Sequence, residues 1–213
     1  MSKVKTDYFI FVDSDDYIMP DLMETIEKYD NYDILSFKSY KVDDNGKILE
    51  KLEKETFELI DGQSFMRHSF RTNAWYVVPW SYVYNTKFWR EHNLDYPNYY
   101  VLEDTSGTPI ALINAKRMIS IDYYGYCYVQ TNESTFRTNT DEKINKNTVA
   151  YLFHYDNLSE YITNFDCSEK FKIIFRDYIA NSILWYGTTL PRKHLNEFVK
   201  ELNLKDENHK KYK

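Results

Sequence analysis

The first two thirds of the chain alternate short apolar runs with polar turns, and the last third changes to helical periodicity. Phe-Ile-Phe-Val at 9–12 is wholly apolar, which predicts a buried strand of the kind found in parallel sheets. Asp-Asp-Asn-Gly at 43–46 predicts a tight turn between two strands. Extended segments are expected over 9–12, 33–42, 47–50, 75–85, 117–121 and 123–130.

Helices are predicted where acids or capping residues precede a helical spacing of apolar side chains. Pro20 followed by Asp21 and Glu24 marks a helix start, and Asp61 and Thr86 are each expected to cap a helix. The predicted helices span about 20–29, 63–70, 86–91, 105–115, 147–162 and 168–190.

This pattern also predicts the domain organisation. No strand-like run follows residue 138, and a stripe from Phe171 to Ile183 has helical spacing. We therefore expect an α/β part over residues 1–140 and a helical tail over 141–213. The last residues, 205–213, are rich in Lys, Asp, Glu and Asn and are expected to fray into solvent.

Composition excludes several classes of function. Of 213 residues 43% are hydrophobic and 18% aromatic, which indicates an ordered globular protein, and five glycines leave no glycine-rich phosphate loop. A net charge of −6 argues against nucleic-acid binding. Cys127 and Cys167 are far apart, which argues against a zinc site or disulfide framework and favours the cytoplasm. No signal peptide or membrane span is predicted, so membrane contact is expected only peripherally, at the inner face.

The chemistry-bearing feature is the acidic cluster that ends the first apolar run: Asp13, Asp15 and Asp16. Ligands of open α/β sheets bind beyond the carboxyl ends of strands, where these acids are expected to lie. Alternate carboxylates make a hard oxygen site that suits Mg²⁺ or Mn²⁺, and such an ion neutralises a diphosphate. The simplest alternative is that these acids only cap the helix beginning at Pro20. Tyr17 disfavours an EF-hand and a haloacid-dehalogenase-type phosphatase, because both need a different residue there.

The stretch around this cluster resembles a known family. Tyr-Phe-Ile-Phe-Val-Asp-Ser-Asp-Asp-Tyr-Ile-Met-Pro at 8–20 is similar to the centre of a family 2 glycosyltransferase of the GT-A type. Trp-Ser-Tyr-Val-Tyr at 80–84 and the pair Glu103-Asp104 resemble the later part of the family, and 119–137 resemble its final strands and Ser-containing loop. The resemblance covers roughly residues 7–138. It implies an α/β fold, a partial GT-A mixed sheet flanked by helices, with a C-terminal helical extension.

The resemblance implies roles for the acids at the strand end. Asp13 and Asp15 would hold Mn²⁺ or Mg²⁺ against the diphosphate of a nucleotide-sugar donor. Asp16 would support the donor diphosphate, and Arg137 is expected to contact it from a later loop.

The acceptor side is implied in the same way. Asp104 would act as the catalytic base that deprotonates the acceptor hydroxyl, and Glu103 would hold the acceptor beside it. Trp80 is expected to stack on a sugar ring. The alternative is that Glu103 and Asp104 only favour a helix start, and that most tyrosines are half-buried wall residues.

Three departures from the family pattern qualify the function. The processive synthases carry Gln-x-x-Arg-Trp, which is absent here, so single-sugar transfer is favoured; Gly107 replaces a bulkier residue and is expected to loosen the acceptor side. The family's first segment, which forms most of the nucleotide site, does not precede the strand at 9–12.

Two hypotheses of function therefore stand. The first is an inverting, metal-dependent glycosyltransferase that acts on a glycan or lipid-linked acceptor in surface polysaccharide synthesis. The second is a non-catalytic remnant, or a carbohydrate-binding or assembly subunit, whose sheet is completed by a second copy or by a complementing chain.

Overall fold

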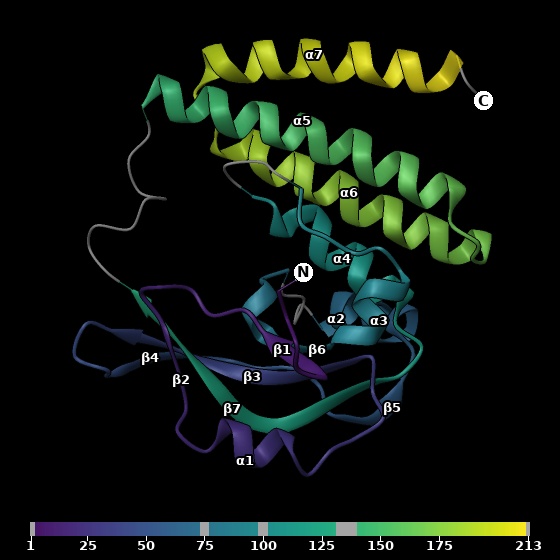
Figure 1. Ribbon diagram of the computed structural model, residues 1–213. Helices are drawn as coiled ribbons and strands as arrows, with labels where there is room; N and C mark the ends of the chain where they lie inside the picture. Colours follow the sequence, from purple (N-terminus) through teal and green to yellow (C-terminus); the bar gives the residue numbers. More distant parts are fainter. Residues whose placement is uncertain (1–2, 73–76, 98–101, 131–139, 212–213) are drawn as a thin grey trace. The chain divides into compact units, whose positions relative to one another are not determined.

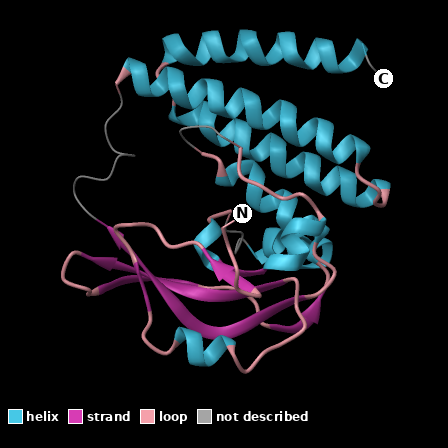
Figure 2. Cartoon of the chain, viewed as in Figure 1, coloured by secondary structure: helices cyan, strands magenta, loops and turns pink. Residues whose placement is uncertain are grey.

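The computed structural model describes residues 3–72, 77–97, 102–130 and 140–211. The chain forms two compact units, and Figure 1 shows the course of the chain through both. Unit 1 comprises residues 1–96 and 107–137, and unit 2 comprises residues 97–106 and 138–213. Strands lie in unit 1, whereas the three long helices that follow residue 140 lie in unit 2 (Figure 2). Residues 97–106, which carry Glu103 and Asp104, therefore group with the helical region rather than with the sheet.

Unit 1 is built on one mixed sheet with the strand order β1-β6-β3-β7-β2, to which β4 adds at β3 and β5 at β7. Within the described residues β3 and β7 form the parallel pair, and the other pairs are antiparallel. The strands are β1 (Tyr8–Ile10), β2 (Tyr17–Ile18), β3 (Ile34–Asp43), β4 (Ile48–Leu52), β5 (Phe57–Ile60), β6 (Tyr82–Asn85) and β7 (Met118–Gln130).

The predicted hairpin around residue 44 is confirmed. Asp43 Oδ1 accepts hydrogen bonds from the backbone N–H groups of Asn45 and Lys47, both at 2.9 Å. Gly46 adopts a φ of 77°, a left-handed conformation that glycine tolerates without strain. These contacts reverse the chain from β3 into β4.

The prediction for the first apolar run was wrong in one respect. It forms strand β1 as expected, but β1 pairs antiparallel with β6 at the end of the strand order and is only half-buried. Its apolar side chains Phe9 and Phe11 pack against the core on one side of the sheet, which explains the hydrophobic run without a central, parallel position.

Other differences from the sequence prediction have local causes. The strands expected at 117–121 and 123–130 are one continuous strand, β7, whose pairing with β3 shifts register near Lys38. The strands β2 and β5 were not predicted, because segments of two and four residues are too short to show a recognisable period.

The helices of unit 1 are α1 (Leu22–Ile26), α2 (Gly62–Thr72), the short 3₁₀ helix η1 (Pro79–Ser81), α3 (Thr86–Glu91) and α4 (Asp104–Asn114), which enters unit 1 at Gly107. The Asp61 cap is confirmed, since its Oδ1 accepts from the Ser64 N–H at 2.9 Å. The predicted Thr86 cap was wrong by one position. The Asn85 side chain accepts from Phe88 N, and Thr86 is the first helical residue.

The two faces of the sheet bury separate cores, because side chains alternate along each strand. On one face Ile34, Tyr82 and Met118 pack with Phe65 and Leu112 from α2 and α4. On the other face the neighbouring strand residues pack with α1 and with Trp80: Leu35, Phe37, Val83, Ile119, Ile121 and Tyr126.

Gly107 is required by close packing in unit 1. A Cβ atom at this position would lie 2.3 Å from Cδ1 of Tyr96, whose hydroxyl hydrogen-bonds with Tyr84 and Thr108. The expected loosening of the acceptor side by Gly107 stays a prediction. The Tyr96 ring occupies the space that a larger residue would take.

Unit 2 consists mainly of α5 (Asp141–Asn164), α6 (Glu169–Thr189) and α7 (Arg192–Lys211). Tyr151 of α5 stacks on Tyr186 of α6, with ring centroids 4.1 Å apart, and Phe198 of α7 packs edge-on against Tyr186. Helix α7 corrects the expectation of a frayed end, because residues 192–211 are helical. None of the helices in the described ranges is both long and apolar enough to cross a membrane.

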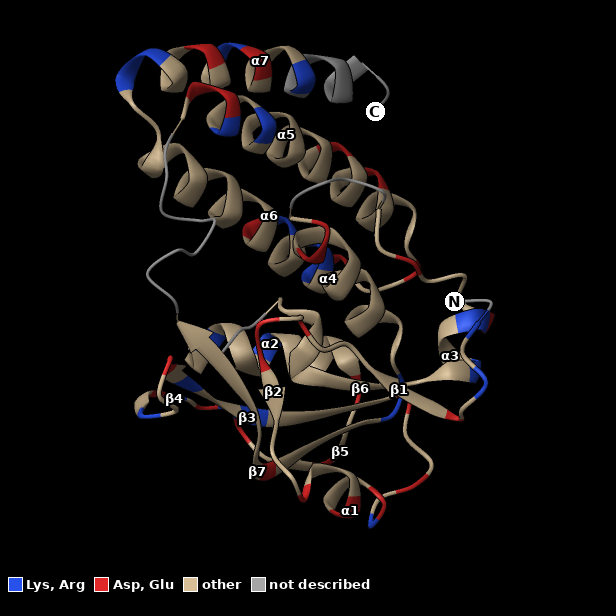
Figure 3. Ribbon diagram, turned by 60° about the vertical axis from the view of Figure 1, so that its left-hand side comes forward, with Lys and Arg blue, Asp and Glu red and all other residues tan. Residues whose placement is uncertain are grey.

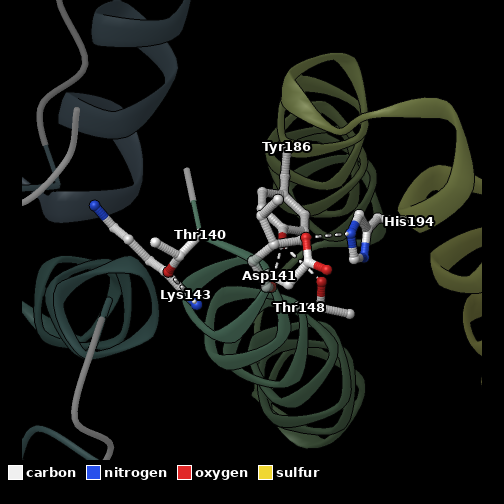
Figure 4. A network of polar contacts seen from close by, with 7 residues as sticks. Thr140, Asp141, Lys143, Thr148, Tyr186 and His194 are labelled. Carbon is white, nitrogen blue, oxygen red and sulfur yellow. Dashed lines mark hydrogen bonds and ion pairs between the residues drawn. The ribbon is translucent and has the colours of Figure 1, made fainter. Parts of the chain in front are cut away.

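A polar network near the start of α5 joins the three helices of unit 2 (Figure 4). The Tyr186 hydroxyl donates to the Ile144 carbonyl at 3.0 Å and contacts Thr148 Oγ1 at 2.7 Å. His194 of α7 lies 3.3 Å from the Asp141 carboxylate. These contacts link α6 and α7 to the first turns of α5.

Candidate functional site

The acidic cluster forms a loop between β1 and β2, drawn red in Figure 3. A turn over Ser14 and Asp15 is closed by a 3.2 Å hydrogen bond from Asp16 N to the Asp13 carbonyl. Asp13 and Asp15 are exposed, whereas Asp16 is partly buried. The turn therefore separates two carboxylates that face solvent from a third that faces the protein.

The Asp16 carboxylate is bonded to β7 through both oxygens. Oδ1 accepts from the Val129 N–H at 2.8 Å, and Oδ2 accepts from the Tyr126 hydroxyl at 2.8 Å. The same hydroxyl accepts from the Asp13 N–H at 3.1 Å. Burial raises the pKa of the Asp16 carboxyl, the two hydrogen bonds from β7 oppose this rise, and the neighbouring carboxylates add to it.

These contacts decide against the capping alternative for the cluster. The residue before α1 is Asp21, whose side chain makes no capping hydrogen bond, and the loop at 13–16 leads into β2 instead. Met19 N also donates to the Gly125 carbonyl at 2.9 Å. The acids thus belong to a loop that is hydrogen-bonded to β7.

Trp80 is buried against strand β7 rather than exposed to solvent. Its ring stacks on Tyr126 with centroids 4.4 Å apart and an interplanar angle of 5°, and it is 4% exposed. Tyr128 stacks on it as well, at 5.6 Å. The predicted contact of Trp80 with an acceptor sugar remains a prediction, and the contact that the structure shows is with the aromatic residues of β7.

A buried lysine supports the segment that carries Trp80. The ammonium nitrogen of Lys54 donates to Ser36 Oγ at 2.9 Å and to the Ser81 carbonyl at 3.3 Å, and it lies 4.1 Å from the centre of the Tyr82 ring. Burial lowers the pKa of Lys54 well below its usual value. This lysine therefore fastens the end of η1 to strand β3.

The second group of predicted residues, Glu103 and Asp104, lies at the start of α4 within unit 2. Burial raises the pKa of Asp104 to about 6, and the adjacent Glu103 carboxylate adds to the rise. Thr105 Oγ1 donates to Asp104 Oδ1 at 3.4 Å. A carboxylate with a pKa near 6 is suited to accept a proton near neutral pH.

Side chains from the C-terminal helices hold this segment. Tyr178 of α6 donates through its hydroxyl to the Thr105 carbonyl at 2.8 Å. His154 of α5 contacts Ser106 Oγ through Nδ1 at 3.0 Å. Burial lowers the pKa of His154 to about 4, so its imidazole is neutral at physiological pH. These partners contact the first and second residues after Asp104 and fix the first turn of α4.

The structure therefore groups the predicted residues in two sets. Asp13, Asp15 and Asp16 share one loop in unit 1, which Tyr126 joins to Trp80 through its bonds to Asp13 and Asp16. Glu103 and Asp104 lie together in unit 2. Arg137 lies outside the described residues.

The carboxylates of the acidic loop suit a metal ion that is also bound by phosphate groups of a substrate. Within the described ranges no group of three or more His, Cys, Asp or Glu side chains is arranged to hold an ion. Mg²⁺ is commonly bound by one or two carboxylates together with substrate phosphates. The exposed oxygens of Asp13 and Asp15 suit an ion of this kind, completed by a diphosphate.

Known structures share this fold. TarS 1–349 from S. aureus in complex with UDP-GlcNAc has a TM-score of 0.71 and 17% identity, over 94% of this chain and 57% of that chain. TarS 1–349 in complex with UDP has a TM-score of 0.64 and 18% identity, over 94% of this chain and 56% of that one. No protein-family model and no curated protein matches the sequence.

These similarities show the fold. The predicted class is confirmed: a GT-A-like mixed sheet flanked by helices, with a helical C-terminal region. The chain spans somewhat more than half the length of the TarS 1–349 structures that it resembles.

Some residues of the site were not predicted from the sequence. Tyr126 fell in a predicted Tyr-rich strand, but its partners Trp80 and Asp16 are more than forty residues away in the chain. His154 and Tyr178 fell on predicted helices, where their spacing is that of core residues. Alternating aromatics after Ile121 were the one available signal.

Proposed function

We propose that this chain transfers a sugar from a nucleotide-sugar donor to a hydroxyl group of a glycan or lipid-linked acceptor, with inversion at the anomeric carbon. One observation carries the proposal. The loop at the end of β1 exposes Asp13 and Asp15 while it is bonded to β7 through Asp16, in a fold shared with a protein that binds UDP-GlcNAc and UDP. Synthesis of a surface polysaccharide is the process that such a transfer would serve.

The proposed reaction uses Asp104 as the base. Its carboxylate accepts the proton of the acceptor hydroxyl, and the hydroxyl oxygen forms a bond to the anomeric carbon. The bond from that carbon to the diphosphate oxygen breaks, and its electron pair leaves with the nucleoside diphosphate. Glu103 would orient the acceptor hydroxyl beside Asp104.

The negative charge of the departing diphosphate requires a positive charge that neutralises it. Mn²⁺ or Mg²⁺ bound by Asp13 and Asp15 would neutralise the diphosphate as it departs. Arg137 is proposed to contribute to the same diphosphate. Asp16 supports the donor through the loop, since both of its oxygens already accept hydrogen bonds from β7.

Turnover tests the proposal. UDP release is measured with UDP-GlcNAc, Mn²⁺ and a panel of glycan and lipid-linked acceptors, for the wild type and for Asp104→Asn. We expect metal-dependent release that falls by at least about a hundredfold in the variant, the usual contribution of a general base, while donor binding is retained. Equal turnover of the two proteins would refute the base assignment.

The position of β1 favours a second candidate function, a carbohydrate-binding or assembly subunit completed by another strand. Among the described strands β1 pairs with β6 alone, and Val12 just beyond it is 48% exposed. Open strand edges pair readily with other chains. UDP-GlcNAc binding that appears only in a dimer, or only after a complementing chain is added, would favour this candidate over activity of the single chain.

A further inference from the structure

We propose that Tyr126 is the positioning residue for the acidic loop: its single hydroxyl fixes both ends of the turn and thereby presents Asp13 and Asp15 together toward a metal-bound diphosphate. The inference rests on the proposed function, because it names the residue that prepares the same site. Tyr126 itself is fully buried, so it acts through the loop rather than by touching the ligand.

The geometry of the hydroxyl carries the first step. Tyr126 Oη accepts from the Asp13 N–H at 3.1 Å and donates to Asp16 Oδ2 at 2.8 Å. The first residue of the turn is held by its backbone and the last by its side chain. Asp15 lies between them, so its position follows from these two bonds and from the 3.2 Å turn bond from Asp16 N to the Asp13 carbonyl.

The second step concerns how the hydroxyl is itself held. The Tyr126 ring is stacked on Trp80 at 4.4 Å, nearly parallel, and β7 pairs with β2 at Tyr126 and Cys127. A ring that is fixed on one face and in its backbone cannot swing its hydroxyl away from the loop. The bond to Asp16 is also charge-assisted, which makes it stronger than one between neutral groups.

The third step distinguishes Asp16 from the other two acids. Its second oxygen accepts from the Val129 N–H at 2.8 Å, so its side chain is bonded to β7 at two points. A carboxylate bonded in this way anchors the loop. The exposed side chains of Asp13 and Asp15 remain on the solvent side.

Preorganisation of this kind affects ligand affinity, because a loop that is already ordered loses less entropy when the ligand binds. Removal of the Tyr126 hydroxyl should therefore weaken the binding of metal and nucleotide, although it removes no protein atom that would contact them. Tyr128 provides a matched control. It lies on the same strand and also stacks on Trp80, at 5.6 Å, but it is not part of the hydrogen bonds that join Asp13 and Asp16.

The first measurement is made on the metal-free protein and does not depend on catalysis. Amide hydrogen exchange of Asp13 is compared between the wild type, Tyr126→Phe and Tyr128→Phe. We expect exchange of the Asp13 amide to accelerate by about tenfold in Tyr126→Phe, the factor that corresponds to about 1.4 kcal/mol, and to stay unchanged in Tyr128→Phe. Equal exchange in all three proteins would overturn the proposal.

The second measurement is calorimetric titration with UDP in the presence of Mn²⁺. Tyr126→Phe should bind about tenfold more weakly than the wild type and Tyr128→Phe equally well. Wild-type affinity in Tyr126→Phe would overturn the positioning role. Failure of the wild type to bind would instead count against the proposed function, and the exchange measurement would still decide whether Tyr126 orders the loop.

Asp16→Ala covers the case in which Tyr126→Phe folds poorly. It removes the hydrogen bond from Tyr126 and also the bond from the Val129 N–H, so the loss of UDP affinity should be at least as large as in Tyr126→Phe. Because the two variants share the bond between Tyr126 and Asp16, the double variant should lose less affinity than the sum of the two single losses. Losses that add in full would show that the two residues act independently, and would contradict the proposal.

Discussion

The Tyr178 hydroxyl of α6 donates a 2.8 Å hydrogen bond to the carbonyl oxygen of Thr105, the residue that follows Asp104. Together with the contact between His154 and Ser106, this bond ties the candidate base segment to the helices that follow residue 140. The C-terminal helices therefore have a direct structural role in the proposed site, which a separate helical tail would not have.

Loss of the Tyr178 hydroxyl should affect catalysis more than binding. Tyr178→Phe leaves the Thr105 carbonyl without its donor, which costs about 0.5–1.5 kcal/mol of unfolding free energy. We expect kcat to fall while the donor affinity stays constant, measured by UDP release and by titration. Trp185→Phe is the control, because Trp185 is 61% exposed on the same helix. A kcat equal to that of the wild type would contradict a positioning role for Tyr178.

The pKa of Asp104 predicts the pH dependence of turnover. The base must be deprotonated to work, and its pKa is raised to about 6 by burial and by Glu103. kcat/KM should therefore fall as the pH decreases through about 6. Glu103→Gln removes the smaller cause of the rise, so the midpoint should move to lower pH. A rate that is constant between about pH 5 and pH 7 would exclude Asp104 as the base.

The packing of Tyr96 predicts that Gly107 cannot be replaced. Gly107→Ala would place a methyl group 2.3 Å from the Tyr96 ring, and overpacking of this kind costs about 1–3 kcal/mol. Gly187→Ala is the matched control, since the nearest atom to its Cβ lies 3.6 Å away on Leu195. Urea unfolding should show a loss for the first variant alone. Equal stability of both variants would contradict the close contact.

The buried Lys54 predicts a stability that depends on pH. Its pKa in the folded protein lies well below that in the unfolded chain, so between the two pKa values the unfolded state binds the extra proton. Unfolding free energy should then increase as the pH rises toward the unfolded-state pKa of about 10.4, by up to about 1.4 kcal/mol per unit from this group. Lys54→Met should flatten the dependence, whereas Lys87→Met, at an exposed site, should not. Identical slopes in all three proteins would contradict a lowered pKa of Lys54.

Much of the fold was predictable because its signals are local. The apolar run before Asp13, the turn at Gly46 and the cap at Asp61 each depend on residues a few positions apart. Strand β2 was not predictable, since Tyr17-Ile18 has pairing partners only in β7, more than a hundred residues later.

In the candidate site, too, local features were predictable and long-range contacts were not. Asp13, Asp15 and Asp104 were identified from short motifs, whereas the bonds that organise them are long-range. The hydrogen bond from Tyr126 to Asp16 spans 110 positions, and the contact of His154 with Ser106 spans 48. Neither pair has a periodicity that a sequence displays, because each depends on how β7 and α5 pack within their units.

The acidic loop carries the central claim, and metal-dependent nucleotide binding tests it most directly. UDP-GlcNAc is titrated into the chain with Mn²⁺ and again with EDTA, for the wild type and for Asp15→Asn. The account predicts binding that requires the metal and falls by at least about tenfold in the variant. Binding of equal strength with EDTA, or in Asp15→Asn, would contradict it.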